Sequence, residues 1–295
     1  IPVLRKLKAG QNILSYVKEH KGKSGTPTMG GLAFVLSAIL AESIFLKKAD
    51  RTAVVALTVG FAYLLVGFLD DFLKKKHKEN MGLKAWQKAV FQAFAAVFAG
   101  IYCLRAGLTT LNLPFTHKSV DIGWGMLPLA VFVFLATVNS VNLTDGLDGL
   151  AAGTCVPFFL TLGLLTAIQG EFSSLAMLSF CLCGALGAYL LFNVSPASVF
   201  MGDTGSLALG GLIAAVAMVL KQEILLIIIG FVFVAEVCSV IIQVTYYKKT
   251  HKRIFKMAPL HHHFEMCGWP EEKVVSRFRL AGVIFAILGL VLGVM

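Results

Sequence analysis

Residues 52–71 read TAVVALTVGFAYLLVGFLDD, an apolar segment that ends in two adjacent carboxylates. The run from 52 to 70 is long enough to cross a hydrocarbon core of about 30 Å as a helix. Asp70 and Asp71 then fall where that helix meets water. A membrane protein that keeps carboxylates at a helix end usually handles a cation, a proton or a charged substrate there.

The whole chain has the composition of a membrane protein. Of its 295 residues, 57% are hydrophobic and 14% are charged, and the mean hydropathy is +0.81, outside the range of soluble globular proteins. Apolar stretches of about 17 to 23 residues predict nine transmembrane helices. They lie near 30–46, 52–70, 88–104, 124–143, 149–168, 174–192, 204–220, 224–246 and 278–295. No repeat divides the chain, so we expect one polytopic all-α membrane domain over 1–295.

The basic residues predict the orientation, because cytoplasmic loops carry the excess of Lys and Arg. Of the 26 Lys and Arg residues, 20 lie in 1–29, 72–88 and 248–279, all on one side of the predicted bundle. This side is predicted to be cytoplasmic, and contact with anionic membrane lipids accounts for most of the net charge of +10, so nucleic acid is not indicated. The chain opens IPVLRKLKAGQN, with no signal-peptide layout, and we expect a further apolar segment upstream.

Three more carboxylates lie at predicted cytoplasmic helix ends. Asp145 and Asp148 occur in NSVNLTDGLDGL, and Asp203 occurs in VFMGDTGS at the start of a predicted helix. If the first segment is helical, Asn139, Asn142, Asp145 and Asp148 share a face, although Asp148 could instead cap the following helix. Asp203 could cap its helix, bind Mg²⁺, or do both, since Mg²⁺ takes one or two protein carboxylates.

The adjacent carboxylates are predicted to have different roles. On a helix, the side chains of Asp70 and Asp71 diverge by about 100°. One can face a substrate while the other forms an ordinary interfacial ion pair with Lys74, Lys75 or Lys78.

Three further features are polar. KSGTPTMGG (23–31) can bind an anion through its Lys and backbone N–H groups, or it is a helix cap with an interfacial Lys. The histidines 261–263 in PLHHHFE are too close together to converge on one metal alone, which favours phosphate contact or proton transfer. Glu236 lies inside a predicted span and should pair within the bundle or face a polar groove. The six cysteines show no pairing or zinc spacing and are predicted to be free thiols.

KSGTPTMGG, GFLDDFLK, NSVNLTDGLDGL, FNVSPASVFMGDTGS and PLHHHFE, in this order, resemble the motifs of the bacterial phospho-N-acetylmuramoyl-pentapeptide transferases. These are polyprenyl-phosphate N-acetylhexosamine 1-phosphate transferases, and the resemblance covers essentially the whole chain. It implies ten transmembrane helices, of which the first is not in this sequence, an active site at cytoplasmic helix ends, a bacterial plasma-membrane location and a homodimer.

The resemblance also implies a reaction. UDP-N-acetylmuramoyl-pentapeptide and undecaprenyl phosphate would give UMP and the first lipid intermediate of peptidoglycan, with Mg²⁺ as cofactor. Asp70 would orient or deprotonate the lipid phosphate, and Asp203 would hold the metal. The implied catalytic group is Asp70, Asp71, Asp203, His261 and His262. The implied substrate contacts are Lys74 and Lys88 for phosphate, Lys23, Asp148, Asn193, Phe200 and Gly202 for uridine, and Thr28, Asn139, Asn142, Asp145 and His263 nearby.

Two other functions fit parts of the sequence. A sister transferase would use UDP-N-acetylglucosamine, but the unbroken histidines of PLHHHFE argue against it. A cation-coupled transporter would use the same carboxylates during alternating access, yet transporter sites lie near the bilayer midplane, where only Glu236 is predicted.

Overall fold

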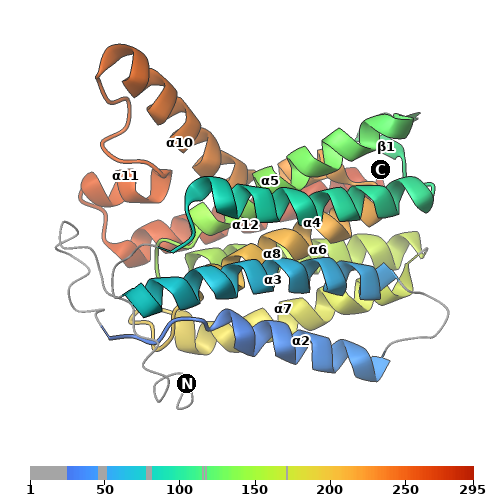
Figure 1. Ribbon diagram of the computed structural model, residues 1–295, viewed down its shortest axis with the longest axis horizontal. Helices are drawn as coiled ribbons and strands as arrows, with labels where there is room; N and C mark the ends of the chain where they lie inside the picture. The colour runs from blue at the N-terminus through green and yellow to red at the C-terminus, as the bar shows by residue number, and fades with distance from the viewer. Residues whose placement is uncertain (1–24, 46–51, 78–81, 115, 117, 171) are drawn as a thin grey trace.

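The protein is an array of long helices lying side by side (Figure 1). The computed structural model describes residues 25–45, 52–77, 82–114, 116, 118–170 and 172–295. The longer helices are α2 (Gly31–Phe45), α3 (Thr52–His77), α4 (Ala85–Arg105), α5 (Met126–Thr144), α6 (Leu150–Gln169), α7 (Ser173–Asn193), α8 (Gly202–Val219), α10 (Phe231–Thr250) and α12 (Glu271–Val294). Two short helices, α9 (Glu223–Ile229) and α11 (Leu260–Met266), flank α10.

The predicted class, an all-α polytopic membrane protein, is confirmed. Eight helices in the described ranges are long and apolar enough to cross a membrane, and α2 is a shorter apolar helix. The prediction of one continuous span over 224–246 is wrong, because α9 ends and α10 begins at Gly230. A β-carbon at this position would come within 2.8 Å of the Leu226 carbonyl oxygen, and glycine is a poor helix former.

Helix α8 forms the centre of the bundle. Every residue from Thr204 to Val219 is buried, and α8 packs against α2, α3, α5 and α6. Glycine and alanine make up much of its sequence, GDTGSLALGGLIAAVAMV. Small residues let helix backbones approach closely within a membrane, and α8 can therefore be covered by helices on all sides.

Glycines place the start of α8 against its neighbours. A side chain at Gly67 in α3 would overlap the Asp203 carbonyl, and one at Gly31 in α2 would overlap the backbone of Gly205. At these two crossings the backbones are in direct contact. The close approach of α3 to α8 brings the carboxylates at the end of α3 next to Asp203.

A small β-hairpin lies at the opposite end of the bundle from Asp203. Strand β1 (Thr110–Leu113) pairs antiparallel with β2 (Lys118–Asp121), with Thr110 opposite Asp121. A 3-10 turn, η2 (Gly123–Gly125), then leads into α5. The expectation of a purely helical fold missed this hairpin, because four-residue strands leave almost no periodic signal.

The C-terminal end of helix α10, from which the chain continues to α11, leans away from the other helices (Figure 1). Its outer half exposes Ile241, Ile242 and Val244. After α11, the chain enters α12 directly behind Pro270, with Glu271 and Glu272 in the first turn. Acidic residues are favourable at a helix N-terminus, so α12 begins about two turns before the predicted span near 278–295.

The contact between α3 and α8 can be tested with Gly67→Ala. The added methyl group would overlap the Asp203 carbonyl, and overpacking of this kind typically costs about 1–3 kcal/mol. We expect a lower apparent Tm in detergent and reduced activity, because Asp70 and Asp203 would be pushed apart. Gly184→Ala in α7 is the matched control, since a β-carbon there meets no atom within 4 Å. Equal Tm values for the two variants would contradict this packing.

Candidate active site

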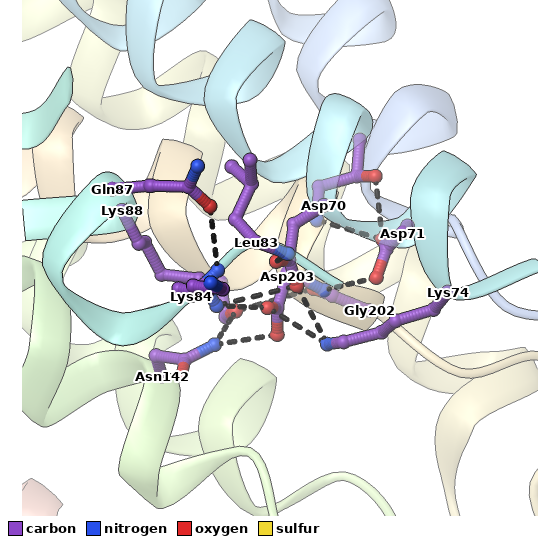
Figure 2. Close-up of polar contacts among 12 residues, drawn as sticks. Asp70, Asp71, Lys74, Leu83, Lys84, Gln87, Lys88, Asn142, Gly202 and Asp203 are labelled. Carbon is purple, nitrogen blue, oxygen red and sulfur yellow. Dashed lines mark hydrogen bonds and ion pairs between the residues drawn. The ribbon is translucent and has the colours of Figure 1, made fainter. Parts of the chain in front are cut away.

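Asp70 is the most buried carboxylate of the site, with 1% of its surface exposed. Its Oδ1 accepts the backbone N–H of Leu83 at 2.7 Å, and its Oδ2 lies 2.7 Å from Lys74 Nζ and 3.3 Å from Lys88 Nζ. A side chain at Gly82 would overlap Oδ1. Glycine at this position therefore lets the start of α4 close over Asp70, as Figure 2 shows.

Asp203 shares both lysines with Asp70. Its Oδ2 accepts hydrogen bonds from Lys74 at 3.0 Å and from Lys88 at 2.5 Å. Its Oδ1 accepts a hydrogen bond at 2.8 Å from the side-chain amide of Asn142, which also donates to Ser206. Helices α3, α4, α5 and α8 thus converge on one carboxylate.

Asp71 has a different set of partners from Asp70. Its Oδ2 accepts the backbone N–H of Thr204 at 2.9 Å and the Thr204 hydroxyl at 2.7 Å, and its Oδ1 accepts the backbone N–H of Asp203 at 3.2 Å. Asp71 therefore satisfies the free N–H groups in the first turn of α8. The two adjacent carboxylates face different groups, as predicted, but it is Asp70 that pairs with Lys74, whereas Asp71 accepts from the first turn of α8.

The three carboxylates can accommodate a metal ion. One oxygen from each of Asp70, Asp71 and Asp203 lies within 4.8 Å of the others. Carboxylate oxygens are the ligands that hard divalent cations prefer. With two lysine ammonium groups against three carboxylates, the cluster is left with one negative charge when all five groups are ionised, which favours binding of a cation.

The Asp145–Gly149 segment is a loop rather than a helix. Helix α5 ends at Thr144 and α6 begins at Leu150, close to the predicted span bounds, so the helical condition under which Asp145 and Asp148 would share a face with Asn142 is not met. The cap position of α6 is Gly149, in the left-handed conformation with φ 71°, so Asp148 is not the N-cap either. A glycine can adopt this conformation at no steric cost.

Contacts from two other segments, the stretch before α8 and the N-terminal part of α12, hold this loop in place. Asp148 Oδ2 accepts the N–H of Ala197 at 3.0 Å, and its own N–H donates to Glu271 at 2.9 Å. Arg279 in α12 donates twice to the Gly149 carbonyl, at 3.1 and 2.6 Å. Arg279 was not among the predicted site residues, although an Arg inside the predicted span 278–295 is a usable signal for a polar contact.

Asp145 lies in the same loop and is half-buried. Burial, followed by the nearby charges of Asp203, Asp71 and Asp148, raises the pKa of Asp145 well above its usual range. Burial and like charges both disfavour the ionised form of a carboxyl group. The loop therefore adds a carboxyl group that retains its proton to a higher pH than an exposed aspartate.

Two extended segments lie beside Asp71. The N–H of Phe200 donates to the Pro27 carbonyl at 2.8 Å, and the N–H of Gly30 donates to the Phe200 carbonyl at 2.9 Å. A side chain at Gly202 would overlap Thr28 Oγ1 and Asp71 Oδ2. The predicted uridine contacts Phe200 and Gly202, together with the predicted groove residue Thr28, are thus brought to one place. Buried Asn193 stabilises the same segment through the Val199 carbonyl at 2.9 Å.

The three histidines of α11 point to different partners. His261 is fully buried beside Glu236 in α10, with 3.2 Å between Nδ1 and Oε1. His262 Nδ1 lies 2.7 Å from Glu265 Oε2. His263 Nδ1 accepts the backbone N–H of Lys256 at 3.1 Å. This divergence agrees with the prediction that the histidines do not converge on one metal.

One predicted contact, Asn139, lies away from the cluster. The amide of Asn139 donates to Gln92 at 2.8 Å and to the Leu135 carbonyl at 2.7 Å, about one helical turn before Asn142. Lys23 lies outside the described residues. All six cysteines are free thiols, as predicted.

Comparisons with known proteins agree with the predicted family. The glycosyl transferase family 4 profile matches residues 53–221, and the phospho-N-acetylmuramoyl-pentapeptide-transferase signature 1 matches residues 23–35. The chain is 47% identical to proteins named phospho-N-acetylmuramoyl-pentapeptide-transferase in Bacillus mycoides (strain KBAB4), Bacillus anthracis (strain A0248) and Bacillus thuringiensis (strain Al Hakam). Each alignment covers 100% of this chain and 92% of the relative. The chain belongs to the phospho-N-acetylmuramoyl-pentapeptide transferase family.

The family 4 profile and the structural cluster coincide in sequence. Asp70, Asp203 and both bridging lysines all lie within 53–221. The histidines of α11 and the loop contacts from α12 lie outside this range. This transferase therefore combines a charged cluster from the matched region with a C-terminal part that contacts the Asp145–Gly149 loop.

The raised pKa of Asp145 predicts a pH-dependent gain in stability for Asp145→Asn. A carboxyl group whose pKa rises on folding binds protons more tightly in the folded state, so it costs stability as pH rises above the ordinary Asp value of about 4. The Asn variant should therefore have a higher apparent Tm than wild type at pH 8, by roughly 2–4 °C for each kcal/mol relieved. The gain should shrink as pH falls towards about 4.

Asp121→Asn provides the comparison for this test. Hydrogen bonds from the Thr109 side chain and the Gly123 N–H lower the pKa of Asp121, so its charged form is favoured in the folded protein. Its replacement should give no gain in Tm at pH 8. A pH-independent Tm difference for Asp145→Asn would contradict the electrostatic explanation.

Proposed function

We propose that this chain transfers phospho-N-acetylmuramoyl-pentapeptide from UDP-N-acetylmuramoyl-pentapeptide to undecaprenyl phosphate, releasing UMP and forming the first lipid intermediate of peptidoglycan. The observation that carries the proposal is the pair of lysines shared by Asp70 and Asp203, in a chain that matches this family over its whole length. A reaction between two phosphate-bearing substrates requires a site that tolerates several negative charges. Ammonium groups beside carboxylates meet this requirement.

The reaction joins two anions, because a lipid phosphate oxygen attacks a pyrophosphate phosphorus. Lys74 and Lys88 are the groups available to neutralise the phosphates, and each can exchange a carboxylate oxygen for a phosphate oxygen. Asp70 is held by the Leu83 N–H and orients the attacking phosphate. Asp71 acts one step away, by fixing the turn that carries Asp203.

Mg²⁺ is the proposed cofactor, with Asp203 as its ligand and Asp70 nearby. The fit rests on the spacing of the three carboxylates and on their excess negative charge. Bound there, the metal would neutralise the charge that develops on the departing UMP.

The nucleotide is proposed to bind beside the Asp145–Gly149 loop. Phe200 is partly exposed and offers an aromatic face for uracil, a contact worth about 1–3 kcal/mol in other base-binding proteins. Asn193 and Asp148 support this surface through the hydrogen bonds described above. Lys23, Thr28, His262 and His263 are proposed to contact the same substrate.

The site is proposed to face the cytoplasm of a bacterium, with the chain crossing the plasma membrane as one domain. The excess of Lys and Arg on the side of the site supports this orientation. The resemblance to the family further implies a homodimer. The deciding assay mixes purified protein, Mg²⁺ and undecaprenyl phosphate with the UDP-linked muramoyl pentapeptide and detects UMP. If UMP forms only with UDP-N-acetylglucosamine, the protein is instead the sister transferase that uses this sugar nucleotide.

Asp203→Asn tests the metal assignment. Loss of the carboxylate removes the proposed ligand and the shared acceptor of two lysines, so the rate of UMP release should fall by at least about 100-fold. Asp121→Asn in the distal hairpin is the matched control and should retain full activity. Normal turnover of Asp203→Asn at limiting Mg²⁺ would remove Asp203 from the metal site.

Asp70→Asn and Asp71→Asn separate the two adjacent carboxylates. We expect Asp70→Asn to lower kcat by about 100-fold while nucleotide binding stays nearly intact, with a flat pH dependence of the residual rate. The lipid phosphate is already largely ionised near pH 8, and Asp70 is paired with two lysines, so orientation is its main role. Asp71→Asn should mainly lower the apparent Tm, because its hydrogen bonds stabilise α8.

Two outcomes would change these assignments. A residual rate of Asp70→Asn that rises with pH would identify Asp70 as a true base, since the phosphate would then lose its proton unaided. Near-normal turnover in Asp70→Asn together with loss in a well-folded Asp71→Asn would reverse the roles of the two residues.

A further inference from the structure

Glu236 is a buried acid that the proposed chemistry does not use. It lies in the apolar helix α10 and has 0% of its surface exposed. Its Oε1 accepts the backbone N–H of His261 at 3.3 Å, whereas Oε2 has no hydrogen-bond partner among the described residues. An incompletely paired carboxyl group inside a membrane helix is expensive, and such groups usually mark functional sites.

The imidazole of His261 is the second part of the same contact. Its ring is also fully buried, and Nδ1 lies 3.2 Å from Glu236 Oε1, within ion-pair distance. The carboxylate thus contacts both the backbone N–H and the ring of one residue. This double contact fixes the first turn of α11 and the direction of the ring, although 25 residues separate Glu236 from His261 in sequence.

The other edge of the ring faces the Asp145–Gly149 loop. A side chain at Gly146 would overlap His261 Nε2 and Cε1, so the backbone of Gly146 lies directly against the imidazole. Asp145 precedes Gly146 and Asp148 follows two residues later. A continuous set of contacts therefore runs from α10 through His261 to the acidic loop.

Packing alone does not account for this arrangement. An apolar side chain at 236 could fill the same space without the cost of burying an incompletely paired carboxyl group. What a carboxylate adds is a direction for the ring: Nδ1 lies 3.2 Å from Oε1, and Nε2 is the edge that faces Gly146, although neither ring nitrogen forms a hydrogen bond among the described residues. In histidine metal ligands, too, the group that contacts one ring nitrogen fixes the orientation of the other nitrogen.

We propose that Glu236 is a positioning residue that orients His261, so that the imidazole holds the Asp145–Gly149 loop in the shape that binds the nucleotide substrate. The proposal rests on the proposed function for the identity of that substrate. It assigns Glu236 an effect on nucleotide affinity rather than on the reaction of the lipid phosphate, because its contacts lead to the loop and not to the cluster of Asp70, Lys74 and Lys88.

A double-mutant cycle tests this assignment. Glu236→Leu and His261→Ala are made singly and together, and UMP release is measured against the concentration of each substrate. Glu236→Leu should raise KM for the UDP-linked substrate by about 10-fold, with kcat and KM for undecaprenyl phosphate within about 2-fold of wild type. In the His261→Ala background, Glu236→Leu should raise this KM by less than a further factor of about 2, because the effects of residues that act as a unit are not additive.

Two further variants separate positioning from folding. Glu236→Gln keeps an oxygen for the His261 N–H and should restore the wild-type Tm while still raising KM by a few fold. Glu223→Gln is the matched control, a second buried acid that follows the far end of α8, roughly 27 Å of helix from Asp203. It should leave KM unchanged.

Hydrogen exchange provides a readout that does not require turnover. Glu236→Leu should speed amide exchange in a peptide covering 145–149 and leave the β1–β2 hairpin unchanged. If wild type releases no UMP but the loop responds in this way, the proposed function fails and the positioning role stands. If wild type is active but the two substitutions are additive in KM, or loop exchange is unchanged, the positioning role is overturned.

Discussion

Asp70 and Asp203 are joined by two lysine ammonium groups, and much of the site depends on this ionic contact. Asp70 is almost completely buried, and a carboxylate at a membrane helix end is stable only when it is paired or hydrogen-bonded. Lys74 comes from the same helix as Asp70, whereas Lys88 comes from α4 and Asp203 from α8. Pairing these charges therefore also fixes three helix ends relative to one another.

The central helix makes this convergence possible. Because α8 presents small residues along its length, α3 approaches it until Gly67 contacts the backbone of Asp203. Asp71 then reaches the N–H groups in the first turn of α8. One pair of adjacent residues thus supplies a charged group for the site and a cap for the helix that carries the opposing carboxylate.

The sequence predicted the membrane class and the gathering of Asp70 and Asp203, because apolar length and carboxylates at span ends are strong local signals. It placed Asp145 and Asp148 between two spans but left a shared helical face open, because the deciding contacts come from Ala197, Glu271 and Arg279, which are distant in sequence. The break at Gly230 was missed because the hydropathy of 224–246 is continuous. The role of Arg279 becomes interpretable only when its partner, the Gly149 carbonyl, is known.

The site has two parts that are held by different physical means. The part formed by α3, α4 and α8 is held by direct backbone contact and ion pairs, which suits phosphate groups whose charge must be neutralised at fixed positions. The Asp145–Gly149 loop is instead held by hydrogen bonds with Ala197, Glu271 and Arg279 and by packing against a histidine that belongs to α11. Loops held by few contacts open at lower cost than packed helices. The loop, on the proposed nucleotide side of the site, is therefore expected to adjust more readily than the packed helix ends on the proposed phosphate side.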